Sequence, residues 1–284
     1  MKQLFTRNFT LLLLGQASSL LGNYTLRFAL SMFVLEETGS AATFAGILAV
    51  SMVPTILLSP LGGVLADRAN RRNIMVALDT LSGLAVLGAM ALFPLGDRVF
   101  LTGALLVILS VLGAFESPTV QACVPQMVEE SQLLRGNALV NQVSSLASLV
   151  TPFLGSLLYT AVGLSPIFLG TAVCFFLTAA LECFLRLGEQ PARPKESLGA
   201  ILKGDLAQGA RFLLREEPGI VKLLLLAALA SFFAAGTAVV GFPYLVRTVL
   251  GLSAELYGAA ESALGVAAIL GGVGVAALGG RLRL

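Results

Sequence analysis

Residues 62–75 read GGVLADRANRRNIM and separate two long apolar segments of the chain. This short stretch contains one carboxylate, Asp67, and three arginines. The whole chain is 57% hydrophobic and only 12% charged, which is about half the charged fraction of a soluble domain. The sequence therefore predicts a polytopic membrane protein in which this charged stretch connects two membrane-spanning segments.

Eight apolar segments are each long enough to cross a hydrocarbon core of about 30 Å as a helix. None shows the alternation of apolar and polar residues that strands of a transmembrane barrel require, so the spans are predicted to be helices. We expect them at residues 9–35, 43–66, 73–93, 99–119, 138–162, 164–186, 220–246 and 254–279.

The positions of the Lys and Arg residues predict the orientation. With the N-terminus in the cytoplasm, only Arg98 and Arg247 fall on the outer side, and Arg27 lies inside the first span. The other cations collect on the cytoplasmic side, as the positive-inside rule requires. Tyrosines favour membrane interfaces, and we expect all four near the outer ends of their spans: Tyr24, Tyr159, Tyr244 and Tyr257.

The stretch 62–75 resembles the loop between the second and third helices of the major facilitator superfamily, which has the form G-x-L-A-D-R-x-G-R-R/K. The matching residues are Gly63, Leu65, Asp67, Arg68, Arg71 and Arg72. Asn70 takes the place of the second glycine, and Asn tolerates the left-handed backbone better than most residues. We expect Gly62 and Gly63 to permit close helix approach.

The resemblance implies that this loop is a conformational latch of the outward-open state, formed by Gly63, Asp67, Arg68, Arg71 and Arg72. In the family, the aspartate docks onto a helix of the second half and the arginines pair with carboxylates. The alternative is that the arginines serve only the positive-inside topology.

The resemblance also implies an all-α integral membrane fold, the major facilitator fold, which has two six-helix bundles. We expect a six-helix transmembrane domain at 1–187, a cytoplasmic linker with an amphipathic helix at 188–219, and the first two helices of an incomplete second bundle at 220–284. A complete member has twelve spans, so the chain is expected to be truncated after the eighth.

Two sets of shorter matches refine the resemblance. Residues 15–17, 37–41, 117–119, 125–128 and 209–213 are similar to the macrolide-efflux and enterobactin-exporter branch. The fifth span resembles the antiporter signature G-x-x-x-G-P-x-x-G-G with three glycines replaced by small residues, and this implies export by antiport. The residues of this antiporter-like motif are Ala147, Thr151, Pro152, Gly155 and Ser156.

The first span carries Gln16, Ser19, Asn23 and Arg27 at steps of three and four residues, which places them on one helix face. Asn141 belongs to a similar stripe in the fifth span. Because polar stripes facing lipid are penalised, we expect them to line a substrate cavity at Gln16, Asn23, Arg27 and Asn141. Hydrogen bonding between helices is the alternative.

Carboxylates inside the spans each need an explanation, because burying one in a bilayer costs about 2.5–3.5 kcal/mol. Glu261, Asp79 and Glu116 are candidates for proton coupling. Asp79 and Glu116 could instead join the latch. We assign Glu182 a structural role, with its side chain reaching the cytoplasmic interface at the end of the sixth span.

Together these features predict a secondary active transporter, a proton-coupled exporter of a small amphipathic compound such as a macrolide or a siderophore, working by alternating access. A non-transporting truncated remnant and an integral-membrane enzyme are the alternatives; the chain has no His, which removes His bases and His-ligated metals. We expect no catalytic residue, cofactor, metal or nucleic acid. The expected partners are the substrate, protons and the lipid bilayer, and the expected state is a monomer in the bacterial cytoplasmic (inner) membrane with a cytoplasmic N-terminus.

Overall fold

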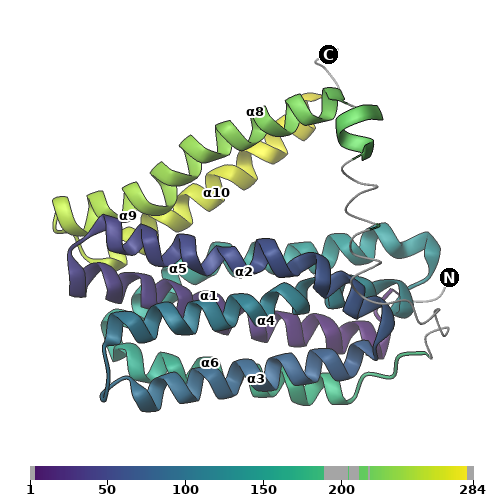
Figure 1. Ribbon diagram of the computed structural model, residues 1–284, viewed down its shortest axis with the longest axis horizontal. Helices are drawn as coiled ribbons and strands as arrows, with labels where there is room; N and C mark the ends of the chain where they lie inside the picture. Colours follow the sequence, from purple (N-terminus) through teal and green to yellow (C-terminus); the bar gives the residue numbers. More distant parts are fainter. Residues whose placement is uncertain (1–3, 189–203, 205–210, 217, 280–284) are drawn as a thin grey trace.

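The computed structural model describes residues 4–188, 204, 211–216 and 218–279, and the regular elements in these ranges are all helical. The first six long helices form one bundle (Figure 1). They are α1 (Arg7–Thr38), α2 (Ala41–Arg68), α3 (Arg71–Leu92), α4 (Arg98–Met127), α5 (Leu133–Val162) and α6 (Leu164–Cys183), with the 3-10 turn η1 (Glu130–Gln132) before α5.

We call the described residues 211–216 and 218–279 the second half. It begins with a π-helical turn, η2 (Phe212–Glu216). A nearly continuous helix follows, made of α8 (Pro218–Ala235), the π-helical η3 (Gly236–Gly241), α9 (Phe242–Tyr244) and the π-helical η4 (Leu245–Val249). The last helix is α10 (Ala254–Gly279). The amphipathic helix predicted in the linker falls mostly at 189–203 and 205–210, outside the described residues.

Side-chain caps explain where the helices of the first bundle begin. Thr6, Ser40, Asn70 and Asp97 each accept a backbone N–H of the helix that follows, which satisfies a donor that has no partner inside the helix. Between α1 and α2 the chain turns at Gly39, whose φ of 58° lies in the left-handed region that favours glycine. Short capped turns of this kind make neighbouring helices antiparallel.

Six segments of the described chain combine the length and the apolar composition needed to cross a membrane. They are Ala41–Arg68, Arg71–Leu92, Arg98–Met127, Glu130–Val162, Leu164–Cys183 and Gly219–Val249. The α1 and α10 helices are 32 and 26 residues long but are not in this set; in α1 a polar face lowers the hydropathy. The multi-pass character is thus clear, whereas the number of eight spans stays a prediction.

The first bundle has two ends, which we name the Glu36 end, where α1 meets α2, and the Arg71 end, where α2 meets α3. Its helices pack as the pairs α1–α6, α3–α6, α2–α4, α3–α4 and α1–α5. One apolar core includes Leu30, Leu106 and Phe168, and a second core nearer the Arg71 end includes Phe9 and Met75. These cores hold the six helices as one unit.

The second half touches the first mainly toward the Glu36 end. There η4 contacts α1, η3 contacts α2, and α10 packs against α5. Toward the Arg71 end, α8 and α10 diverge from the six-helix bundle (Figure 1). Many large apolar side chains of α8 are exposed, such as Leu223 at 66% and Phe232 at 73%.

Candidate functional site

A cavity of about 690 Å³ lies among α1, α2, α4 and α5 of the first bundle. The four residues predicted to line a substrate cavity all line it: Gln16, Asn23, Arg27 and Asn141. The remaining wall combines apolar groups such as Met52 with polar groups such as Ser117. An amphipathic molecule needs a lining of this mixed kind.

Arg27 is the cation of this cavity wall. Its Nε donates to Asn23 Oδ1 at 3.0 Å, and its Nη2 donates to Ser110 Oγ on α4 at 3.2 Å. Tyr24, one turn away, pairs its hydroxyl with Ser144 Oγ on α5 at 3.2 Å. The polar face of α1 therefore makes interhelical hydrogen bonds and also faces a cavity, so the two explanations considered for the stripe both apply.

A smaller cavity of about 260 Å³ lies between the first bundle and the second half. Its lining includes Arg27 from α1, Thr151 and Pro152 from α5, and Glu261 from α10. Glu261 Oε2 is buried and has no hydrogen-bond partner among the described residues. The arrangement brings a cation of one half and a carboxylate of the other to a shared space.

The antiporter-like motif of α5 is a packing surface. Ala147, Thr151 and Ser156 are buried, and Thr151 Oγ1 donates to the Ala147 carbonyl of its own helix at 2.6 Å. A Cβ on Gly155 would press on Phe28 of α1, and one on Gly258 of α10 would collide with the Pro152 carbonyl and Ser156 Oγ. The small residues thus let α5 approach α1 and α10 at the junction of the two halves.

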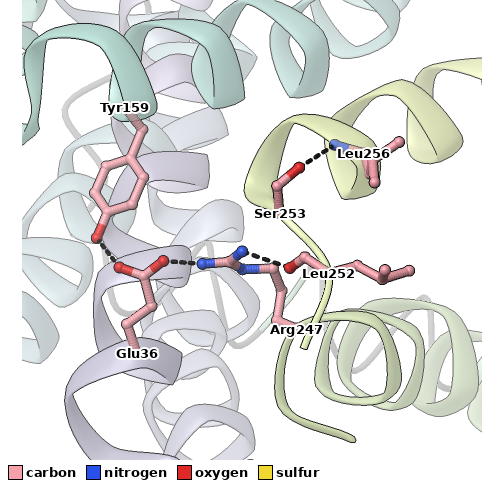
Figure 2. Close-up of polar contacts among 6 residues, drawn as sticks. All are labelled: Glu36, Tyr159, Arg247, Leu252, Ser253 and Leu256. Carbon is pink, nitrogen blue, oxygen red and sulfur yellow. Dashed lines mark hydrogen bonds and ion pairs between the residues drawn. The ribbon is translucent and has the colours of Figure 1, made fainter. Parts of the chain in front are cut away.

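A polar link joins the two halves at the Glu36 end (Figure 2). Arg247 of η4 forms an ion pair with Glu36 of α1, and Tyr159 of α5 donates its hydroxyl to Glu36 Oε2 at 2.6 Å. Arg247 also donates to the Leu252 carbonyl at 2.7 Å. We call Glu36, Tyr159 and Arg247 the Glu36 link. Apolar clusters around Met32 and Leu35 surround it with side chains from both halves.

The loop at residues 62–75 is organised by Arg71. The Arg71 guanidinium donates to the carbonyls of Ala66 and Ala122, both at 2.8 Å, and pairs with Asp67 Oδ1 at 3.4 Å. These contacts join α2, α3 and α4 within the first bundle. Arg72 makes a long contact of 3.5 Å with the Leu185 carbonyl. Arg68 lines a hollow of about 310 Å³ beside Arg71.

Two details of the loop correct the sequence-based expectations. Asn70 has φ −65° and caps α3 through its side chain, so it replaces the glycine as a helix cap and not as a left-handed residue. Gly62, and not Gly63, permits the close helix approach. A Cβ on Gly62 would collide with α4 at the Ala114 carbonyl, while one on Gly63 would meet nothing within 4 Å.

The carboxylates predicted for proton coupling lie in different places. Glu116 faces the larger cavity, where Gln16 Nε2 approaches its Oε1 at 3.5 Å, and Glu261 faces the smaller one. Asp79 is fully buried and accepts a hydrogen bond from Ser19 Oγ at 3.2 Å. The expectation that Glu182 reaches the cytoplasmic interface was wrong, because its side chain is 1% exposed.

Sequence reasoning did not identify the Glu36 link. The sequence indicated this link only by placing a carboxylate, Glu36, and an arginine, Arg247, at the outer ends of predicted spans. It predicted Tyr159 only as an aromatic ring at the membrane interface. Tyr159, Tyr244 and Tyr257 belong to the apolar clusters of the Glu36 end. Tyr24 was misplaced, since it lies in the middle of α1 and lines the larger cavity.

Comparisons with known proteins identify the family of this chain. The family model of the Major Facilitator Superfamily matches residues 12–283. Macrolide efflux protein A of Streptococcus pyogenes is 30% identical over 224 residues, covering 77% of this chain and 54% of that protein. The chain thus spans about half the length of this relative.

Two further comparisons agree. The multidrug efflux pump Tap of Mycobacterium bovis is 28% identical over 197 residues, covering 65% of this chain and 45% of that protein. The crystal structure of PepTSo, a POT family transporter, superposes with a TM-score of 0.56 at 20% identity, covering 92% of this chain and 54% of that one. This likeness concerns the fold. On the match of nearly its whole length, the chain belongs to the Major Facilitator Superfamily.

Proposed function

We propose that the chain is a secondary active exporter of a small amphipathic compound, such as a macrolide or a siderophore, driven by protons and working by alternating access. The observation that carries the proposal is the cavity of about 690 Å³ whose wall combines apolar side chains with Gln16, Asn23, Arg27 and Asn141. The macrolide and multidrug efflux relatives support the direction and the class of substrate. Membership of the family favours transport over enzymatic activity.

In this proposal the Arg71 end faces the cytoplasm and the Glu36 end faces outward, in a bacterial inner membrane crossed by eight spans, α1 and α10 included. The chain acts as a monomer. The Glu36 link then closes the outer side, and the divergence of α8 and α10 leaves the cytoplasmic side open (Figure 1). Such a state would accept substrate from the cytoplasm.

The proposed roles of individual residues follow from where they lie. Gln16, Asn23, Arg27 and Asn141 contact the substrate in the larger cavity. Glu261, Asp79 and Glu116 are the candidates for carrying protons. Arg71, with Asp67, stabilises the first bundle at the end that must close against the second half when the protein opens outward.

The test is accumulation of a radiolabelled macrolide, such as erythromycin, in bacterial cells that lack their own efflux pumps. Cells expressing the 284-residue chain should accumulate less than cells with empty vector, and a protonophore should remove the difference. Arg27→Ala should also remove it, whereas Arg98→Ala, a matched change at an exposed helix start, should not. Equal accumulation with and without the correctly inserted chain would instead favour a non-transporting protein.

A further inference from the structure

Two carboxyl groups lie buried inside the first bundle, apart from both cavities. Asp79 of α3 is 0% exposed and Glu182 of α6 is 1% exposed. The two carboxyls are neighbours close enough to interact, and Glu116 of α4 lies close enough to act on both electrostatically. The α3 and α6 helices that carry the pair pack directly against each other.

Within the described residues, the pair lacks the donors that two buried carboxylates would need. No N–H or hydroxyl donor reaches Asp79 Oδ2 or either oxygen of Glu182. The Arg71 guanidinium donates to carbonyls of the backbone and to Asp67. Two ionised carboxylates in this position would repel each other with little screening.

A single proton resolves this conflict. A protonated carboxyl is a donor, so a proton on either group turns the contact between Asp79 and Glu182 from repulsion into a hydrogen bond. A metal ion does not fit equally well, because the described Asp, Glu and Cys residues contain no group of three that could hold one. A proton is therefore the ligand that best fits the pair.

A route leads from the larger cavity to the pair. Glu116 faces the cavity and lies beside Ser19, and Ser19 Oγ donates to Asp79 Oδ1 at 3.2 Å. The Ser19 hydroxyl can accept a proton from Glu116 while it passes its own proton to Asp79. Asp79 then shares that proton with Glu182, and no bond between heavy atoms changes.

We propose that Asp79 and Glu182 form a proton-binding pair inside the first bundle, loaded from the cavity through Glu116 and Ser19. The inference rests on the proposed proton-coupled transport and assigns Glu182 a role in it. Because α3 and α6 pack within the six-helix bundle, the pair keeps its surroundings while the two halves move. The first bundle thus contains a proton-binding site that exchanges its proton with the larger cavity.

Infrared spectroscopy of the 284-residue chain in lipid nanodiscs tests the pair without any transport assay. The wild type should show the carbonyl stretch of a protonated carboxylic acid at neutral pH, and both Asp79→Asn and Glu182→Gln should reduce this band. Glu130→Gln, a change of the same kind at an exposed site, should leave it unchanged. A wild-type spectrum without the band, or a band that persists unchanged in both variants, would overturn the proposal. If one variant does not fold, the other variant and the wild-type spectrum still test the proposal.

Transport driven by an imposed pH gradient in proteoliposomes separates this inference from the proposed function. Loss of gradient-driven transport in Glu182→Gln, together with a reduced band, supports both. A wild type that shows the band but no gradient-driven transport contradicts the proposed function and leaves the pair intact. Gradient-driven transport with an unchanged band in the variants means that another carboxylate carries the proton.

Discussion

The two ends of the molecule hold their helices together in different ways. At the Arg71 end, Arg71 joins α2, α3 and α4, which all belong to the first bundle. At the Glu36 end, Glu36 and Tyr159 of the first bundle bind Arg247 of the second half. One end therefore stabilises a unit, and the other end connects two units.

The two ends therefore affect different properties: one the stability of the first bundle, the other the relative position of the two halves. The Arg71 contacts can persist whatever the position of the second half, because every partner moves with the first bundle. The Glu36 link cannot persist if the halves part at that end. We therefore expect substitutions at the Arg71 end to change the free energy of unfolding, and substitutions at the Glu36 end to change the distance between the halves.

The largest effect is expected for Arg71→Ala. The substitution removes two hydrogen bonds of 2.8 Å to the Ala66 and Ala122 carbonyls as well as the pair with Asp67. Hydrogen bonds from charged groups contribute about 1.5–3 kcal/mol each, so the loss of two should lower the free energy of unfolding by about 3–6 kcal/mol. Denaturant titration of the protein in detergent micelles measures this change.

Arg72→Ala is the matched control for Arg71. Arg72 makes long contacts of 3.4–3.5 Å with Asn73 beside it and with the Leu185 carbonyl, so its loss should cost less than about 1 kcal/mol. Arg71→Lys should recover only part of the stability, because an ammonium group cannot match the planar geometry of three acceptors. Equal losses for Arg71→Ala and Arg72→Ala would show that charge alone, and not the hydrogen bonds, stabilises this end.

An intermediate effect is expected for Arg247→Glu. It places a second carboxylate beside Glu36, so the halves should separate at this end while the first bundle stays folded. Spin labels at the exposed positions Ala42 and Glu255 should report a longer and broader distance distribution by double electron–electron resonance.

The reversed pair sharpens this test. Glu36→Arg combined with Arg247→Glu should restore the short distance, since the attraction is regained with the charges exchanged. Arg98→Glu, an equal change of charge at an exposed site of the same end, should leave the distance unchanged. A distance that stays short in Arg247→Glu would mean that the apolar clusters around Met32 and Leu35 hold the halves together without the ion pair.

The smallest effect is expected for Tyr159→Phe. The substitution removes one hydrogen bond of 2.6 Å to Glu36 and leaves the ion pair with Arg247 in place. Its cost should be about 0.5–1.5 kcal/mol, seen as a modest rise in the population of long distances between the same labels. Tyr244→Phe is the control at the same end. A shift as large as that of Arg247→Glu would indicate that Tyr159, and not the ion pair, sets the position of Glu36.

Local features of the sequence predicted much of the fold. The first predicted span, 9–35, corresponds to α1 at Arg7–Thr38, and the sixth, 164–186, corresponds to α6 at Leu164–Cys183. Length, apolar composition and the steps of three and four residues in α1 and α5 are properties of single helices. For that reason they also predicted which polar residues line the larger cavity.

Contacts between distant segments could not be predicted in the same way. Glu36 and Arg247 are separated by 211 positions, and their pairing depends on how the second half packs on the first. Glu182 was placed at an interface because it lies near the end of α6. In the structure Leu185, beyond that end, packs with Phe9 and Met75 in an apolar cluster that extends the buried region past the helix end. A position near the end of a helix therefore did not predict that the side chain is exposed.

The wide turns of the seventh predicted span have a consequence for how Arg247 finds its partner. Each π-helical turn, η3 and η4, holds more residues than an α-helical turn, and an α-helix rotates by about 100° per residue. Removing one residue from η3 would tighten that turn and rotate everything after it, which would aim the Arg247 side chain away from Glu36. The direction in which Arg247 points, and with it the contact between the two halves at the Glu36 end, is thus set by the winding of the helix that precedes it.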